Sequence, residues 1–67
     1  MVAIEILKIV QENPRITPAE ISQKMGISVQ YTRNTLRVLS ELELVATAVR
    51  GIYLITDLGK TVLEYHR

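Results

Sequence analysis

Hydrophobic residues recur along this chain with a helical period in four stretches, and a fifth stretch has the composition of two strands. The first helical stretch runs from residue 1 to residue 12 without a helix breaker, and the Asn13-Pro14 pair closes it. Its apolar positions follow an i, i+3, i+4, i+7 spacing, which predicts one helical face packed against the rest of the chain. The residues on that face are Ala3, Ile6, Leu7 and Val10.

Two more helices are predicted in quick succession. Thr17 is a good N-cap, Pro18 takes the first helical position, and Glu20 completes a capping box three residues after the cap. Gly26 ends this helix, because glycine adopts the left-handed conformation of a C-cap without a Cβ penalty. Ser28 is the next N-cap, so the following helix begins almost at once. Two helices this close must cross steeply, as in a helix-turn-helix.

The helix predicted from residue 28 to residue 43 has two unlike faces. One arc is assigned to the core and consists of Thr32, Thr35, Leu36, Leu39 and Leu42. The opposite arc holds Gln30, Arg33, Asn34 and Arg37. Arginine pairs with guanine, and glutamine or asparagine with adenine, in the major groove of DNA.

An ordinary solvated helix face is the alternative interpretation of that second arc. Against it, Arg33 and Arg37 are like charges four residues apart, a spacing that destabilises an isolated helix by about 0.2 to 0.5 kcal/mol. Acidic residues are also absent between Ile21 and Ser40. The arc therefore favours contact with DNA.

After this helix the chain becomes rich in residues that favour strands. The segments LVATAV and IYLIT flank Arg50-Gly51 and predict a hairpin of two short strands. Arg50 would stand at the tip of this hairpin. There it could contact the phosphate backbone or an adjacent minor groove, or be an ordinary solvated turn residue, and both interpretations stay open.

A last helix is predicted to begin at Thr56, an N-cap candidate followed by an acidic residue at the positive end of the helix dipole. Its apolar stripe is assigned to Leu58, Val62 and Tyr65. Leu63 lies off that stripe. Its two possible roles are an intersubunit contact and a single exposed leucine on the surface.

Composition sets further limits. With 67 residues we expect a single domain over residues 1–67, and a domain of this size buries only about 60% of the surface that its unfolded chain exposes. The absence of cysteine excludes disulfides and thiolate metal sites, and His66, the only histidine, is expected to be a surface residue rather than a metal ligand. No cluster of titratable groups and no glycine-rich phosphate loop is present, so we expect neither catalysis nor a cofactor.

The apolar runs are far shorter than the roughly 18 residues that cross a bilayer, and the N-terminus lacks a signal-peptide pattern. We therefore expect a cytoplasmic protein.

The net charge is only +1, but its distribution is uneven. Lys24, Arg33 and Arg37 are unopposed in the middle of the chain, with Arg15 and Arg50 on either side, so one side of a nearly neutral molecule is expected to be basic.

The first helix carries more apolar surface than one packed face needs. Val2, Ile4 and Ile9 flank its apolar stripe on both sides. The apolar arc spans roughly 220 degrees, where a surface helix needs little more than about 100. The last helix and the sheet of the same chain are one possible cover. We favour a second copy, in a homodimer formed through these three residues and the C-terminal helix.

Two segments carry a resemblance to a known family. They are ITPAEISQKMGISVQYTRNTLRVLSELELV and YLITDLGKTVLE. With the order of elements, they make the chain resemble the winged helix-turn-helix family of prokaryotic DNA-binding regulators, whose larger members of the MarR and ArsR kinds are dimers that sense a ligand or a metal. The resemblance implies an α+β, mostly helical fold: a three-helix core, a two-stranded β-wing and a C-terminal helix.

The resemblance also assigns residues. It implies that Gly59 permits close packing at the start of the last helix and that Arg50 belongs to the wing. It implies further that the residues facing DNA are Ser28, Val29, Gln30, Arg33, Asn34 and Arg37. The chain departs from the family's pattern at Ser22, Thr32 and Glu43, where alanine, a larger aliphatic residue and glycine are usual. The two hydroxyls can bond back to helix carbonyls.

Two functional hypotheses follow. The first is a transcriptional regulator that binds double-stranded DNA sequence-specifically as a homodimer, with helix 28–43 in the major groove and the two helices about 34 to 36 Å apart. The second is a protein–protein interaction module within a larger assembly, which the low net charge and the surplus apolar surface favour.

Overall fold

The computed structural model describes residues 1–49 and 51–66. Within them the chain forms four helices and one hairpin, in the predicted order. The mostly helical α+β fold is therefore confirmed. The elements are α1 (Val2–Glu12), α2 (Pro18–Met25), α3 (Val29–Glu41), β1 (Val45–Val49), β2 (Ile52–Ile55) and α4 (Asp57–Tyr65).

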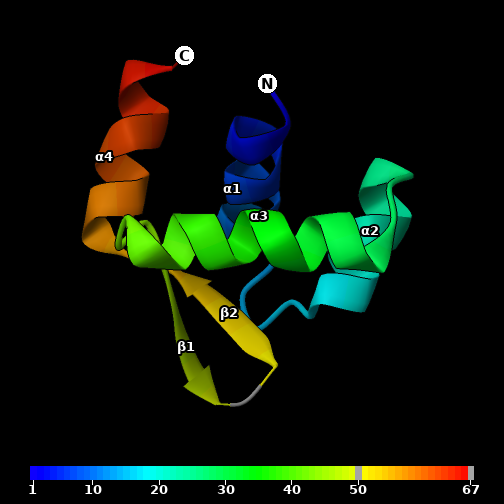
Figure 1. The fold of residues 1–67 in the computed structure, drawn as a ribbon. Helices are drawn as coiled ribbons and strands as arrows, with labels where there is room; N and C mark the ends of the chain where they lie inside the picture. The colour runs from blue at the N-terminus through cyan, green and yellow to red at the C-terminus, as the bar shows by residue number, and fades with distance from the viewer. Residues whose placement is uncertain (50, 67) are drawn as a thin grey trace.

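Helix α1 is the central element of the fold. It contacts α2, α3, α4 and β2. Figure 1 shows α3 lying across α1, α4 standing beside α1, and the hairpin projecting from the opposite side of α3. The start of α1 and the end of α4 lie at the end of the molecule away from the hairpin (Figure 1).

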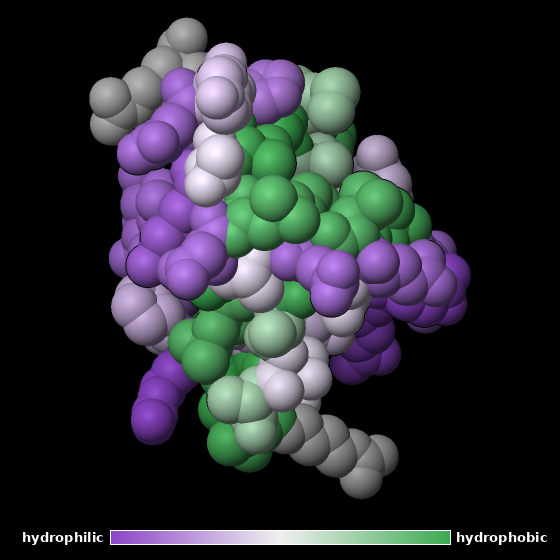
Figure 2. All heavy atoms as spheres, turned by 90° about the vertical axis from the view of Figure 1, so that its left-hand side faces the viewer, coloured by the Kyte–Doolittle hydropathy of each residue, from purple (hydrophilic) through white to green (hydrophobic). Residues whose placement is uncertain are grey.

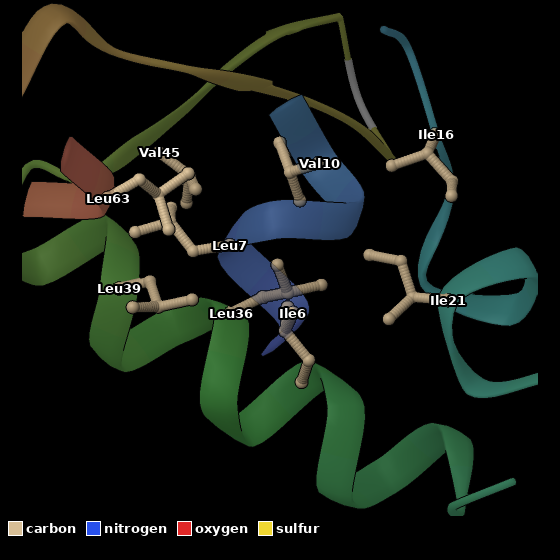
Figure 3. Packing of buried hydrophobic residues seen from close by; sticks show 9 residues of the cluster. All are labelled: Ile6, Leu7, Val10, Ile16, Ile21, Leu36, Leu39, Val45 and Leu63. Carbon is tan, nitrogen blue, oxygen red and sulfur yellow. The ribbon is translucent and has the colours of Figure 1, made fainter. Parts of the chain in front are cut away.

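Nine apolar side chains converge around α1 and form the core (Figure 3). Three of the four residues predicted for the buried face of α1 are fully inside, and Ala3 is half-buried. The core residues are Ile6, Leu7, Val10, Ile16, Ile21, Leu36, Leu39, Val45 and Leu63.

The predicted helix starts are confirmed. The hydroxyl of Thr17 accepts from the backbone N–H of Glu20 at 3.3 Å, and the Glu20 carboxylate accepts from the backbone N–H of Thr17 at 3.0 Å, which is the reciprocal pair of a capping box. Ser28 caps α3 by accepting from the N–H of Tyr31 at 3.0 Å. Gly26, at φ 69°, ends α2 in the left-handed conformation.

Helix α3 ends two residues earlier than predicted. Its last residue is Glu41, and Glu43 adopts the left-handed conformation with φ 62°. The N–H of Leu44 donates to the carbonyl of Leu39 at 2.9 Å, and the N–H of Glu43 donates to that of Ser40 at 3.0 Å. These two bonds form a Schellman motif with glutamate at the position that glycine usually takes.

The hairpin is antiparallel and fixed at several points. Thr47 pairs with Tyr53, and the register shifts between Thr47 and Val49, which forms a β-bulge near the tip. The N–H of Tyr53 donates to the carbonyl of Ile16 at 3.2 Å, so the segment between α1 and α2 adds an isolated bridge. At the base, the hydroxyl of Thr56 donates to the carbonyl of Glu43 at 2.6 Å. These bonds hold the hairpin beside the end of α3.

Helix α4 packs with a different face from the one predicted. Leu58 is 50% exposed and Tyr65 86% exposed, whereas Leu63 is only 6% exposed and belongs to the core. The assignment of Leu63 to an off-stripe position was therefore wrong. The cause is Gly59, because a Cβ there would overlap the Leu44 carbonyl oxygen, so the backbone of α4 approaches the chain on the Gly59 side.

The core arc of α3 was also misplaced. Leu42, assigned to the core, is 58% exposed, and Thr35 is only half-buried. The buried face is centred on Thr32, Leu36 and Leu39, which leaves Leu42 beyond its edge and past the last helical residue.

The surplus apolar residues of α1 are partly covered by their own chain. Val2, Ile4 and Ile9 are half-buried and pack against the core cluster. Across the described parts of the chain, no helix has the length and apolarity needed to cross a membrane.

Candidate nucleic-acid interface

Helix α3 presents one continuous polar face. Gln30, Arg33, Asn34 and Arg37 are all exposed, as predicted, and they follow i, i+3, i+4, i+7 spacing. The opposite face is buried through Thr32, Leu36 and Leu39. Because the buried face is fixed by packing, the rotation of the helix about its axis is fixed as well, and the four polar side chains point away from the core.

A groove lies between this face and the hairpin. Residues of α3 and residues of the hairpin line it and are called its two walls. Figure 1 shows the hairpin below α3. The residues that line the groove are Pro18, Gln30, Arg33, Asn34, Arg37, Ser40, Glu41, Thr47, Gly51 and Tyr53. All four residues of the polar face of α3 are among them.

The hairpin wall is positioned by strand pairing. Thr47 and Tyr53 are direct partners across the two strands, so their side chains share one face of the hairpin. Tyr53 is half-buried, and its backbone bond to Ile16 ties this wall to the segment that precedes α2. The hairpin wall is therefore held in place by backbone bonds rather than by the side chains that line the groove.

The chemistry of the groove suits bases and phosphates. Two guanidinium groups, from Arg33 and Arg37, each offer a planar fork of donors to guanine or to phosphate. Gln30 and Asn34 offer paired donors and acceptors, and the Nε2 of Gln30 donates to the Oδ1 of Asn34 at 3.0 Å. Glu41 adds an acceptor-only group at the last residue of α3.

The carboxylate nearest the start of α2 has a structural role. Glu20 accepts hydrogen bonds from the backbone N–H and from the hydroxyl of Thr17, each at 3.0 Å. The backbone bond, followed by the hydroxyl bond, lowers the pKa of Glu20 from its ordinary value of 4.5. Its charge is used to cap α2.

A family model described as winged helix-turn-helix DNA-binding matches residues 3–46, which run from α1 to the first strand. The chain belongs to this family. Helices α2 and α3 are its helix-turn-helix, α3 is the recognition helix, and the β1–β2 hairpin is the wing. The closer likeness to the MarR and ArsR kinds stays a prediction.

One solved structure that is similar to this winged helix is described as the crystal structure of T. acidophilum IdeR. The sequences are 28% identical, and the match has a TM-score of 0.85 over 90% of this chain. It covers 30% of the IdeR chain, so the winged helix spans less than a third of that protein's length. No curated protein matches the sequence.

The predicted DNA-facing residues of the winged helix fall into three groups. The groove brings Gln30, Arg33, Asn34 and Arg37 together. Ser28 and Val29 are not among the groove residues: Ser28 caps the recognition helix, and Val29 is half-buried. Arg50 lies outside the described residues.

Sequence reasoning missed part of the groove. Ser40 and Glu41 continue the helical spacing three and four residues after Arg37, and this signal was available in the sequence. Thr47 and Tyr53 of the wing line the other wall. Finding them requires the strand register, which the sequence does not state.

A metal site was not expected in this winged helix. Among the described residues, no group of three or more His, Cys, Asp or Glu side chains is arranged to hold a metal ion.

Proposed function

We propose that this winged helix binds double-stranded DNA sequence-specifically, with recognition helix α3 in the major groove. The observation that carries the proposal is the polar face of α3, where two arginines and two amides line one groove while the opposite face is fixed in the core. These are the side chains that pair with guanine and adenine edges. The wing, through Thr47 and Tyr53, would contact the adjacent backbone or sugars.

The proposed role is that of a cytoplasmic transcriptional regulator. A protein that occupies a promoter through such a site blocks access of the polymerase by its bulk. The proposal includes no catalysis and no cofactor. If each subunit neutralises about three to five phosphates, log K falls with log salt by about 0.9 for each contact.

We propose further that the protein acts as a homodimer. Large apolar side chains remain exposed where the end of α3 meets the start of α4, among them Leu42 at 58% and Leu58 at 50% exposure. The bond between Thr56 and Glu43 holds these two ends together. Figure 2, which views the α4 side of the molecule, shows hydrophobic surface gathered on this face. Val2, Ile4 and Ile9, already half-buried, would contribute less than first expected.

The test is selection of binding sites from a random duplex pool at two salt concentrations. The wild type is compared with the double variant Arg33→Ala, Arg37→Ala, which removes both guanidinium groups from the groove. The control is Lys8→Ala, Lys60→Ala, which removes the same charge from the exposed α1–α4 side.

We expect the wild type and the lysine variant to enrich the same two-fold-symmetric site and the arginine variant to enrich none. An equal loss of enrichment in both variants would show that DNA binding depends only on net charge. No enrichment by the wild type at either salt concentration would overturn the proposal.

The second candidate is a protein-interaction module. It is favoured by the same exposed apolar residues and by a net charge of only +1. In that case the arginine variant retains binding to the partner protein, and replacing Leu42 and Leu58 by serine abolishes it. The opposite pattern, with DNA binding lost only in the arginine variant, favours the first function.

A further inference from the structure

Two amide side chains on the recognition helix are joined to each other. The Nε2 of Gln30 donates to the Oδ1 of Asn34 at 3.0 Å, one helical turn further on. Both side chains are exposed and both line the groove. The pair therefore lies on the surface where bases would be read, and the bond exists before any ligand is present.

The bond gives the Asn34 amide a direction. An unpaired asparagine amide can turn over, and the two orientations exchange a donor for an acceptor. The donor from Gln30 holds Oδ1 towards the N-terminal turn of α3, which leaves Nδ2 on the side away from Gln30. Oδ1 keeps a second lone pair, and both hydrogens of Nδ2 stay available.

An ordered acceptor beside an ordered donor matches one base. Adenine presents the N6 amino donor next to the N7 acceptor in the major groove, and a bidentate asparagine satisfies both. Guanine presents two acceptors at the same edge and would leave Oδ1 facing another acceptor.

We propose that Asn34 reads an adenine and that Gln30 is a positioning residue, which sets the orientation of the Asn34 amide. The inference rests on the proposed function, because it requires α3 in the major groove. Gln30 then affects the base preference only at the position that Asn34 reads. That adenine lies among guanines contacted by Arg33 and Arg37.

The site selected by the wild type gives the first test. Asn34→Ala should lower the preference for adenine at one position by about tenfold or more and leave the other positions unchanged. Gln30→Ala should lower the preference at that same position. If each amide reads a base of its own, Gln30→Ala instead changes a different position and the positioning role is wrong.

Two isosteric variants test the direction of the amide. Asn34→Asp still accepts from Gln30 but has no donor for N7, and a carboxylate accepts from cytosine N4, so the preferred base should change from adenine to cytosine. Gln30→Glu removes the donor, so the Asn34 amide must turn over to donate to the new carboxylate. Gln30→Glu should therefore reduce the adenine preference more than Gln30→Ala does.

Affinities are measured by competition among duplexes that differ at the one position. Gln11→Ala, on the exposed surface of α1, is the matched control, and thermal unfolding verifies that each variant is folded. If the wild type enriches a site but Asn34→Ala leaves every base preference intact, this inference is wrong and the proposed function stands. If the wild type enriches no site, the proposed function itself fails.

Discussion

At the scale of single residues, local chemistry decides the ends of the helices. Thr17, Ser28 and Thr56 cap their helices through the side-chain bonds that the sequence predicts, because each cap involves residues only three apart. Glu43 shows the limit of this reasoning. It occupies a left-handed position at φ 62°, although a side chain there is costly.

Replacing Glu43 with glycine should stabilise the protein. Glycine has no Cβ penalty at this φ, and this gain exceeds the extra freedom of the unfolded chain, so we expect an increase of up to about 1 kcal/mol in the free energy of unfolding. Urea unfolding measures it. Glu41→Gly is the control, because Glu41 is the last residue of α3 and glycine there should destabilise by about 0.5 to 1 kcal/mol. A loss of stability in both variants would show that the Glu43 side chain matters more than its backbone.

Glu20 gives the helix-turn-helix a dependence on acid pH. The bonds from Thr17 are stronger to the charged carboxylate than to the neutral carboxyl group, and they lower the pKa of Glu20 below 4.5. A lowered pKa means that the stabilisation is complete above that ordinary value and is lost as the pH falls through the lowered one. Glu20→Gln removes this titration, so its urea midpoint should fall less than that of the wild type between about pH 5 and 2.5. Gln23→Ala, an exposed change on α2 that involves no titrating group, should follow the wild type.

At the scale of elements, the sequence predicts each helix and strand but not every buried face. In α4 the stripe of Leu58, Val62 and Tyr65 satisfies helical spacing as well as the stripe of Gly59 and Leu63 does. The choice depends on the contact of Gly59 with Leu44, fifteen residues earlier in the chain. The bridge from Ile16 to Tyr53 is equally non-local. Periodicity contains no information on such contacts, so the groove wall that contains Thr47 and Tyr53 stayed unpredicted.

The corrected face of α4 predicts a contrast between two large residues. Leu63→Ala should lower the free energy of unfolding by about 2 to 5 kcal/mol, because it opens a cavity in the core against α1. Tyr65→Ala should change it by no more than about 0.5 kcal/mol, since this side chain is 86% exposed. Denaturant unfolding of both variants is the measurement. A larger loss of stability in Tyr65→Ala than in Leu63→Ala would show that α4 buries the face predicted from periodicity.

At the scale of the whole molecule, the proposed dimer must place two recognition helices correctly. Partners in a helix-turn-helix dimer insert them about 34 to 36 Å apart. With 13 residues, α3 is about 20 Å long, so its midpoint lies about 10 Å from its C-terminal end. A two-fold axis beside Leu42 and Leu58 and perpendicular to α3 would place the midpoints about 20 Å apart, plus twice the distance between the end of α3 and the axis. The exposed apolar face lies at a position that this spacing allows.

The exposed leucines Leu42 and Leu58 should matter for dimer formation but not for folding. The double variant Leu42→Ser, Leu58→Ser removes apolar side chains that are at least half exposed, so the fold should be retained with little change in stability. Sedimentation analysis should show a loss of dimer, because the C2 contact loses the same patch from both copies. Affinity for the symmetric site should fall, while weak binding to a half-site, which depends on Arg33 and Arg37, is kept. Val49→Ser, at 61% exposure and near the tip of the hairpin, is the control. Dimers that persist in the double variant would show that the interface lies elsewhere, with α1 as the alternative. Loss of half-site binding would show that these leucines support the DNA-binding face of α3 itself.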